Sequence, residues 1–98
     1  MTVNEERLVP AIYVTEDYRT QKYYYDTLDK RDEAWSNILT KYTKENELGK
    51  LSKFILDEED GVLTVEYKSE PAFGSFVDDE SITFKQVNAY LHFNYMKI

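Results

Sequence analysis

The pattern of apolar residues is clearest between residues 29 and 48, where it has the period of a helix. Four apolar side chains stand at i, i+3, i+4 and i+7: Trp35, Ile38, Leu39 and Tyr42. Residues at this spacing share one face of an α-helix. Asp29 is the expected N-cap, and Gly49 stands where a C′ glycine would end the helix. We therefore predict a helix over residues 29–48 that buries the face carrying the only tryptophan of the chain.

The pattern before Asp29 allows two arrangements. Residues 11–48 contain neither glycine nor proline, and Thr15 could cap a helix that begins at Glu16. One arrangement has a helix over 16–28, a break at Asp29 and a second helix to residue 48. The other has one continuous helix over the same span, which is long against a mean helix length of about 11–12 residues, so the break is favoured. Residues 8–14 are apolar and partly β-branched and could form a short strand, but Pro10 has no N–H and would have to lie at an edge or among the first residues of that strand. A flap over the core is therefore the favoured interpretation.

Period-two alternation predicts strands in the second half of the chain. Residues 51–57 and 62–68 fit two strands joined through Asp60-Gly61, a pair typical of a type I′ hairpin turn. Three residues of the second strand would face the core, namely Leu63, Val65 and Tyr67, and three would face water, namely Thr64, Glu66 and Lys68.

Residues 87–95 alternate between apolar and polar side chains and predict a further strand. The apolar phase changes between Phe84 and Val87, which predicts a turn or bulge at Lys85-Gln86. The alternative is a helix that begins at Ser81 and carries Phe84, Val87 and Leu91 on one face. We expect one α+β domain over residues 1–98, with 1–7 frayed, in which one or two helices pack on a mostly antiparallel sheet of about four strands.

Composition narrows the classes of partner. The chain has 19 acidic against 12 basic residues and a formal net charge of −7, so its field repels phosphate backbones and no direct nucleic-acid partner is expected. The absence of cysteine excludes disulfides and thiolate metal sites. No apolar run approaches the roughly 20 residues of a membrane span, so we expect a cytoplasmic protein without a membrane partner.

A search for catalytic or cofactor-binding residues finds no motif. His92 is the only histidine, and the sequence contains no nucleophile-elbow motif whose serine it could activate as a general base. The glycines form neither a dinucleotide nor a Walker motif. If Gly61 were the glycine at position 6 of an EF-hand loop, Leu56 would occupy position 1, where an oxygen ligand is required. The sequence therefore does not match a calcium-binding EF-hand loop. We expect no cofactor, no metal and no enzyme activity.

The residues that stand out instead are suited to binding a protein. They are two acidic runs and part of a tyrosine triplet: Asp57, Glu58, Glu59, Asp60, Asp78, Asp79, Glu80, Tyr23 and Tyr24. The leading hypothesis is a non-enzymatic inhibitor that offers an acidic surface, imitating nucleic acid, to a basic site on a partner such as a nucleic-acid-binding protein. The small, acidic, tyrosine-rich composition is compatible with phage or mobile-element accessory proteins. The alternatives are a small adaptor or homodimer that binds through a hydrophobic sheet edge, and an enzyme that uses His92 or a carboxylate.

Overall fold

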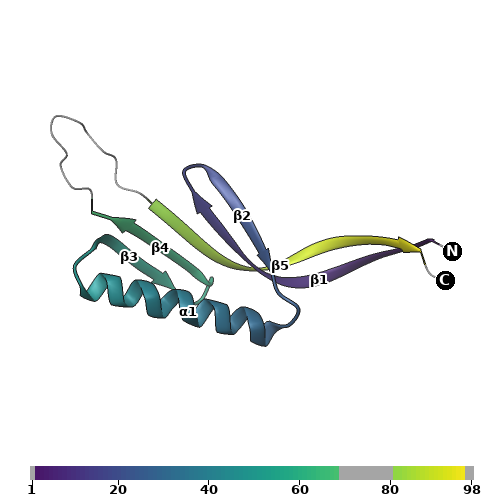
Figure 1. The fold of residues 1–98 in the computed structure, drawn as a ribbon, viewed down its shortest axis with the longest axis horizontal. Coiled ribbons are helices and arrows are strands. Elements are labelled where there is room, and N and C mark those ends of the chain that lie inside the picture. The colour runs from purple at the N-terminus through teal and green to yellow at the C-terminus, as the bar shows by residue number, and fades with distance from the viewer. Residues whose placement is uncertain (1, 69–80, 97–98) are drawn as a thin grey trace.

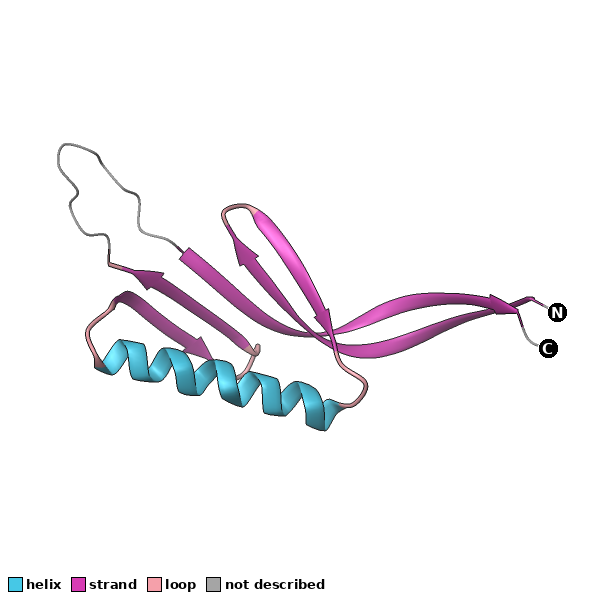
Figure 2. Cartoon of the chain, in the orientation of Figure 1, coloured by secondary structure: helices cyan, strands magenta, loops and turns pink. Residues whose placement is uncertain are grey.

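The fold is one helix packed on a single antiparallel sheet, and the computed structural model describes it for residues 2–68 and 81–96. The elements in chain order are β1 (Thr2–Glu16), β2 (Arg19–Tyr24), α1 (Leu28–Glu47), β3 (Leu51–Asp57), β4 (Val62–Tyr67) and β5 (Ser81–Met96) (Figure 1). The strands lie in the order β2-β1-β5-β4-β3, with α1 on one face of the sheet (Figure 2). The α+β prediction is confirmed, with one helix and five strands rather than about four.

Helix α1 lies where its periodicity predicts, within a residue at each end. Its N-cap is Thr27, whose side-chain oxygen accepts the Lys30 N–H at 3.2 Å, so Asp29 lies in the first turn and is not the cap. At the other end Gly49 has φ +74°, its N–H binds the Asn46 carbonyl at 3.0 Å, and the Lys50 N–H binds the Glu45 carbonyl at 3.0 Å. These two bonds form a Schellman motif, which confirms the predicted glycine stop.

Both predicted arrangements for residues 16–28 are wrong, because this stretch turns back on β1 as a hairpin. Glu16 pairs with Arg19, and the two residues between them have φ of +50° (Asp17) and +63° (Tyr18). Positive φ at both central residues defines a type I′ turn. Threonine and tyrosine, which are abundant here, prefer strands, and pairing with β1 outweighs a weak helical pattern.

Pro10 lies in the middle of β1, so its predicted place in an edge strand or flap is also wrong. Pro10 stands opposite Asn88 of β5, and on the other side its carbonyl accepts the Tyr25 N–H at 2.9 Å. The ladder between β1 and β2 starts at the next residue, where Ala11 stands opposite Tyr24. The missing N–H therefore removes only one bond at the end of that ladder.

The hairpin of β3 and β4 forms as predicted, but its turn is not of type I′. Its loop spans residues 58–61, and only Gly61, with φ +66°, is left-handed. The Asp57 carboxylate accepts the Asp60 N–H at 3.1 Å and closes the loop from one side.

The core lies between α1 and the strands β3, β4 and β5. Its buried side chains are Tyr42, Leu51, Leu63, Val65, Ile82 and Phe84, and the partly buried Val14, Trp35, Ile38, Leu39, Phe54, Leu56 and Tyr67 pack against them. The ring centroid of Tyr42 lies 5.1 Å from that of Phe84 and 6.4 Å from that of Tyr67. The predicted helix stripe and the inward set of β4 are thus confirmed.

Strand β5 is continuous, and the predicted turn or bulge at Lys85-Gln86 is wrong. Its register with β1 runs without a shift from Ile82 to Met96. The apolar phase changes because different faces carry apolar side chains along its length. Phe84 faces α1, whereas Val87 and Ala89 lie on the face away from the helix.

Beyond the ends of β2 and β4, strands β1 and β5 continue alone as a two-stranded ribbon, which we call the arm (Figure 1). In the arm, residues 2–9 pair with residues 89–96, and the molecule reaches 63 Å along its longest axis. Arg31 of α1 anchors its base, because one guanidinium nitrogen donates to the Val87 carbonyl at 2.9 Å and to the Asn88 side-chain oxygen at 2.8 Å.

Candidate interaction surfaces

The two tyrosines predicted to bind a partner lie on β2, the edge strand of the sheet, and point to opposite faces. Tyr23 stands opposite Ile12, and Tyr24 stands opposite Ala11. Their side chains are 47% and 43% exposed, and all six residues of β2 are exposed. The two rings therefore belong to two different surfaces, because neighbouring residues of a strand alternate between faces.

The first acidic run forms the exposed end of the β3–β4 hairpin. Asp57, Glu58, Glu59 and Asp60 are all exposed. The Asp57 carboxylate also closes the loop, so the carboxylates of Glu58, Glu59 and Asp60 are those of this run that carry no structural role in the described contacts. The second run, Asp78, Asp79 and Glu80, lies outside the described residues, and Ser81, which follows it, pairs with Glu66 at the other end of β4.

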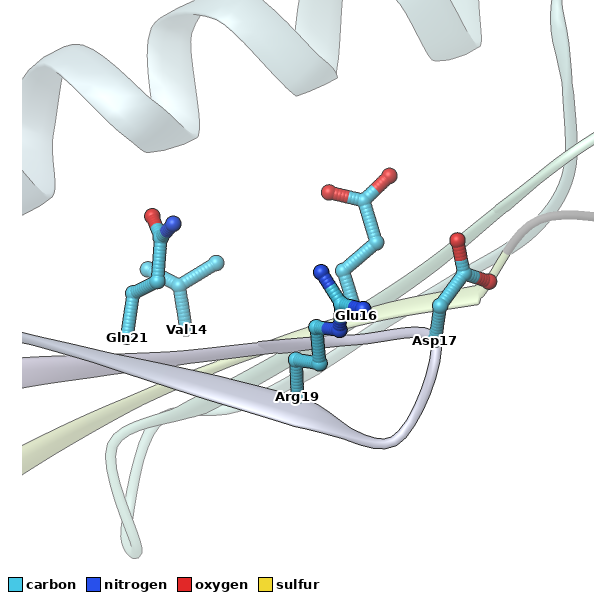
Figure 3. Close-up of a pocket in the computed structure, with 5 residues that line it drawn as sticks. All are labelled: Val14, Glu16, Asp17, Arg19 and Gln21. Atoms are coloured by element: carbon cyan, nitrogen blue, oxygen red, sulfur yellow. The ribbon is translucent and has the colours of Figure 1, made fainter.

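A groove runs between α1 and the β1–β2 hairpin, and we call it the hairpin groove. It consists of two adjoining cavities of about 480 and 340 Å³, which share Val14, Glu16 and Gln21. Figure 3 shows the side chains that line the larger of the two. The smaller cavity is lined mainly by apolar and aromatic side chains: Ile12, Val14, Tyr23, Tyr25, Ile38, Tyr42, Ile82 and Phe84. The larger of the two is lined mainly by polar side chains, with Glu16, Asp17, Arg19 and Gln21 beside Val14.

Tyr23 and Tyr25 are two of the three tyrosines that line the smaller cavity. The Tyr23 hydroxyl donates to the side-chain oxygen of Gln21. Burial raises the pKa of Tyr25, and the neighbouring Tyr23 adds to the increase. The Tyr25 hydroxyl therefore keeps its proton near pH 7 and can act as a hydrogen-bond donor.

Tyr18, at the tip of the β1–β2 hairpin, is the residue that sequence reasoning missed. Its side chain is 106% exposed, and its backbone is left-handed with φ +63°. Glycine and asparagine are the usual residues at such a position, and a bulky residue there is an outlier. The signal was hidden in the sequence because the turn carries Asp-Tyr instead of Asn-Gly.

His92 lies exposed on the arm, directly opposite Glu6, which is exposed as well. Catalytic acid–base residues usually lie in a partly buried site, whereas both members of this pair are exposed. Within residues 2–68 and 81–96, no three histidine, aspartate or glutamate side chains are grouped closely enough to hold a metal ion.

Comparison with known proteins provides no further assignment. A scan against protein-family models finds no match, and searches of the curated proteins and of the solved structures find none either. In the described part of the chain, α1 is too polar to serve as a membrane-crossing helix.

Proposed function

We propose that this chain is a non-enzymatic protein-binding module that contacts its partner through the tip of the β1–β2 hairpin and the acidic end of the β3–β4 hairpin. Tyr18 is the observation that carries the proposal. Its ring buries no surface within the chain, and its left-handed backbone costs on the order of 1 kcal/mol. Folding gains nothing from this side chain, whereas tyrosine is a frequent hot-spot residue in protein interfaces.

The acidic end of the other hairpin indicates the charge of the partner. Glu58 and Glu59 are exposed on a chain with a net charge of −7. Such a surface attracts basic sites on other proteins. In its sharpest form the proposal is an inhibitor whose carboxylates imitate phosphates in a nucleic-acid-binding site, and binding of this kind weakens steeply with salt.

The experiment captures partners from a lysate of the source cell with the tagged chain at low and at high salt, and then compares variants on the protein that is captured. Tyr18→Gly should weaken binding of that protein while raising the melting temperature, because glycine relieves the turn. Glu58→Gln combined with Glu59→Gln should weaken binding mainly at low salt.

Two matched controls test whether the effects are local. Tyr90→Ser removes a tyrosine that is 77% exposed on the arm, and Glu33→Gln with Glu47→Gln makes the same charge change on α1. If Tyr18→Gly left the affinity unchanged, the hairpin tip would not be a contact. If affinity were the same at low and high salt, the nucleic-acid imitation would be wrong.

The arm favours a second candidate function, which is self-association. In the arm, the described strands leave the outer backbone edges of both β1 and β5 without a neighbour. A two-stranded ribbon is marginally stable alone in water, and free edges pair readily with other strands. Sedimentation over a range of concentrations tests this candidate, since a constant monomer mass would exclude it.

A further inference from the structure

The face of the sheet that points away from α1, here called the open face, carries a row of threonines. Cross-strand pairing aligns them on four neighbouring strands: Thr20, Thr15, Thr83 and Thr64. The hydroxyl oxygens of Thr15 and Thr20 lie 3.0 Å apart. No described element covers this face, so the row offers hydroxyl groups to solvent or to a ligand.

The next row of the open face holds two lysines around a tyrosine. Tyr13 stands directly opposite Lys22 of β2 and Lys85 of β5. The Lys22 ammonium lies 5.3 Å from the centre of the Tyr13 ring. Both lysines are exposed, and within residues 2–68 and 81–96 neither has a carboxylate within salt-bridge distance.

Two other cations of this face contact carboxylates. Arg7 contacts Glu5 at 2.7 Å, and Lys53 contacts Glu66 at 3.7 Å. Lys22 and Lys85 thus place two cations without such a contact, among the described residues, at the centre of the face, on a chain whose net charge is −7.

An apolar strip adjoins the lysine row where the arm begins. It consists of Val9, Ala11, Val87, Ala89 and Leu91, which share the open face. Ala11 is 0% and Ala89 7% exposed although no described element covers them. Larger neighbours enclose them, since Ala11 stands between Tyr24 and Val87 in its row. The strip is thus an apolar surface beside two cations.

We propose that the open face docks an acidic, amphipathic segment of a partner protein. Its carboxylates pair with Lys22 and Lys85 and accept hydrogen bonds from the threonine row, while its apolar side chains fill the strip. Charge complementarity selects this occupant, because two exposed lysines without a carboxylate contact in the described residues lie directly beside an apolar strip on this face.

Two other occupants fit this face less well. A second copy of the chain, packed open face to open face about a two-fold axis, would bring the same lysine pairs together. A nucleic-acid strand would meet the field of a chain with net charge −7, and Lys22 rather than a free surface lies over the Tyr13 ring. The docking surface borders both hairpin ends, since Val62 stands opposite Lys85 and also opposite Asp57, and the Thr15–Thr20 pair lies next to the β1–β2 turn. Different variants therefore separate the two proposals: Lys22 and Lys85 test the docking surface, whereas Tyr18, Glu58 and Glu59 test the function proposed above.

The test is a titration of the full chain followed by backbone amide chemical shifts. The probe is a short helical peptide with glutamate and leucine on one side, and its comparison peptide has lysine in place of glutamate. The glutamate peptide should shift the amides of Tyr13, Thr15, Lys22, Thr83 and Lys85, whereas the lysine peptide should leave them in place. Shifts confined to other surfaces, or no binding at all, would overturn the proposal.

Variants and a second probe separate the remaining explanations. Lys22→Gln combined with Lys85→Gln should weaken binding about tenfold, from the loss of two exposed ion pairs. The control Lys41→Gln with Lys50→Gln removes the same charge elsewhere and should change affinity little, so an equal loss would mean that only net charge matters. An oligo-dT strand that bound more tightly than the glutamate peptide and shifted the same amides would reassign the face to nucleic acid. Open-face shifts on dilution of the chain alone would reassign it to a second copy.

Discussion

The two faces of the sheet are built from alternate residues of the same strands, yet they have opposite characters. On the face covered by α1, Leu63 and Val65 are 0% exposed and contribute to the core. Between them Thr64 points to the open face and continues the threonine row. The covered face holds the fold together by burying apolar area, whereas the open face contributes less to stability and carries cations and hydroxyl groups. The difference teaches that alternate residues of one strand can build the core on one side and leave charged and hydroxyl groups exposed on the other.

The largest expected effect comes from cutting a side chain on the covered face. Leu63→Ala should lower the free energy of unfolding by about 2–5 kcal/mol, because it removes buried area and leaves a cavity. Ile55→Ala, on the open face and 53% exposed in the wild type, is the matched control and should cost less than about 1 kcal/mol. Urea unfolding measures both. Equal losses would contradict the division between the faces.

A smaller effect is expected where α1 meets the arm. Arg31→Met removes the donor to Val87 and Asn88 and should cost about 2 kcal/mol, in the range of hydrogen bonds from a charged group. Hydrogen exchange should also become faster in β5 near the base of the arm. Lys30→Met, which loses only an exposed 3.5 Å ion pair to Asp26, is the control. If exchange in β5 were unchanged, Arg31 would not anchor the arm.

The smallest expected effect is a loss of stability at alkaline pH that comes from Tyr67, a tyrosine of the covered face. Burial raises the pKa of Tyr67 well above its usual value, and the hydrogen bond from its hydroxyl to the Glu45 carboxylate adds to the increase. Above about pH 10 the unfolded chain releases this proton and the folded chain retains it, so stability falls as pH rises. Tyr67→Phe should cost about 1 kcal/mol at pH 7 and should reduce this alkaline loss.

The control for this prediction is Tyr90→Phe, which changes a tyrosine that is 77% exposed on the arm. Chemical unfolding at several values between pH 8 and about pH 11 compares the three chains. If the Tyr67→Phe chain lost stability as steeply as the wild type, the buried hydroxyl would not be the source of the alkaline sensitivity.

Local patterns were sufficient to predict the elements whose signals lie close together in the chain. The stripe from Trp35 to Tyr42 predicted α1, and Asp60-Gly61 predicted the β3–β4 hairpin, although not its turn type. The β1–β2 hairpin was missed because its turn has no glycine and its strands are fixed by pairing with β5, which is remote in sequence. Long-range pairing overrides weak local preference.

The candidate surfaces also differ in whether they can be predicted from neighbouring residues in the sequence. The acidic residues Glu58 and Glu59 could be found as a run, and their role in binding remains a prediction. The pairing of Lys22 and Lys85 on either side of Tyr13 could not be predicted from the sequence, because it depends on the register of three strands. A one-residue change in register would send them to the other face.

The pairing of β1 with β5 also has a consequence during synthesis on the ribosome. Strand β1 is made early, but its long partner, residues 82–96, follows only after every other described element. The β1–β2 hairpin can form in the nascent chain, yet Ile12 and Ala11 lack a β5 neighbour until the last strand emerges. Closing so long a stretch of chain is slow, and the emerging polypeptide presents a free apolar strand edge in the meantime. Chaperones that hold nascent chains would therefore meet this protein through β1.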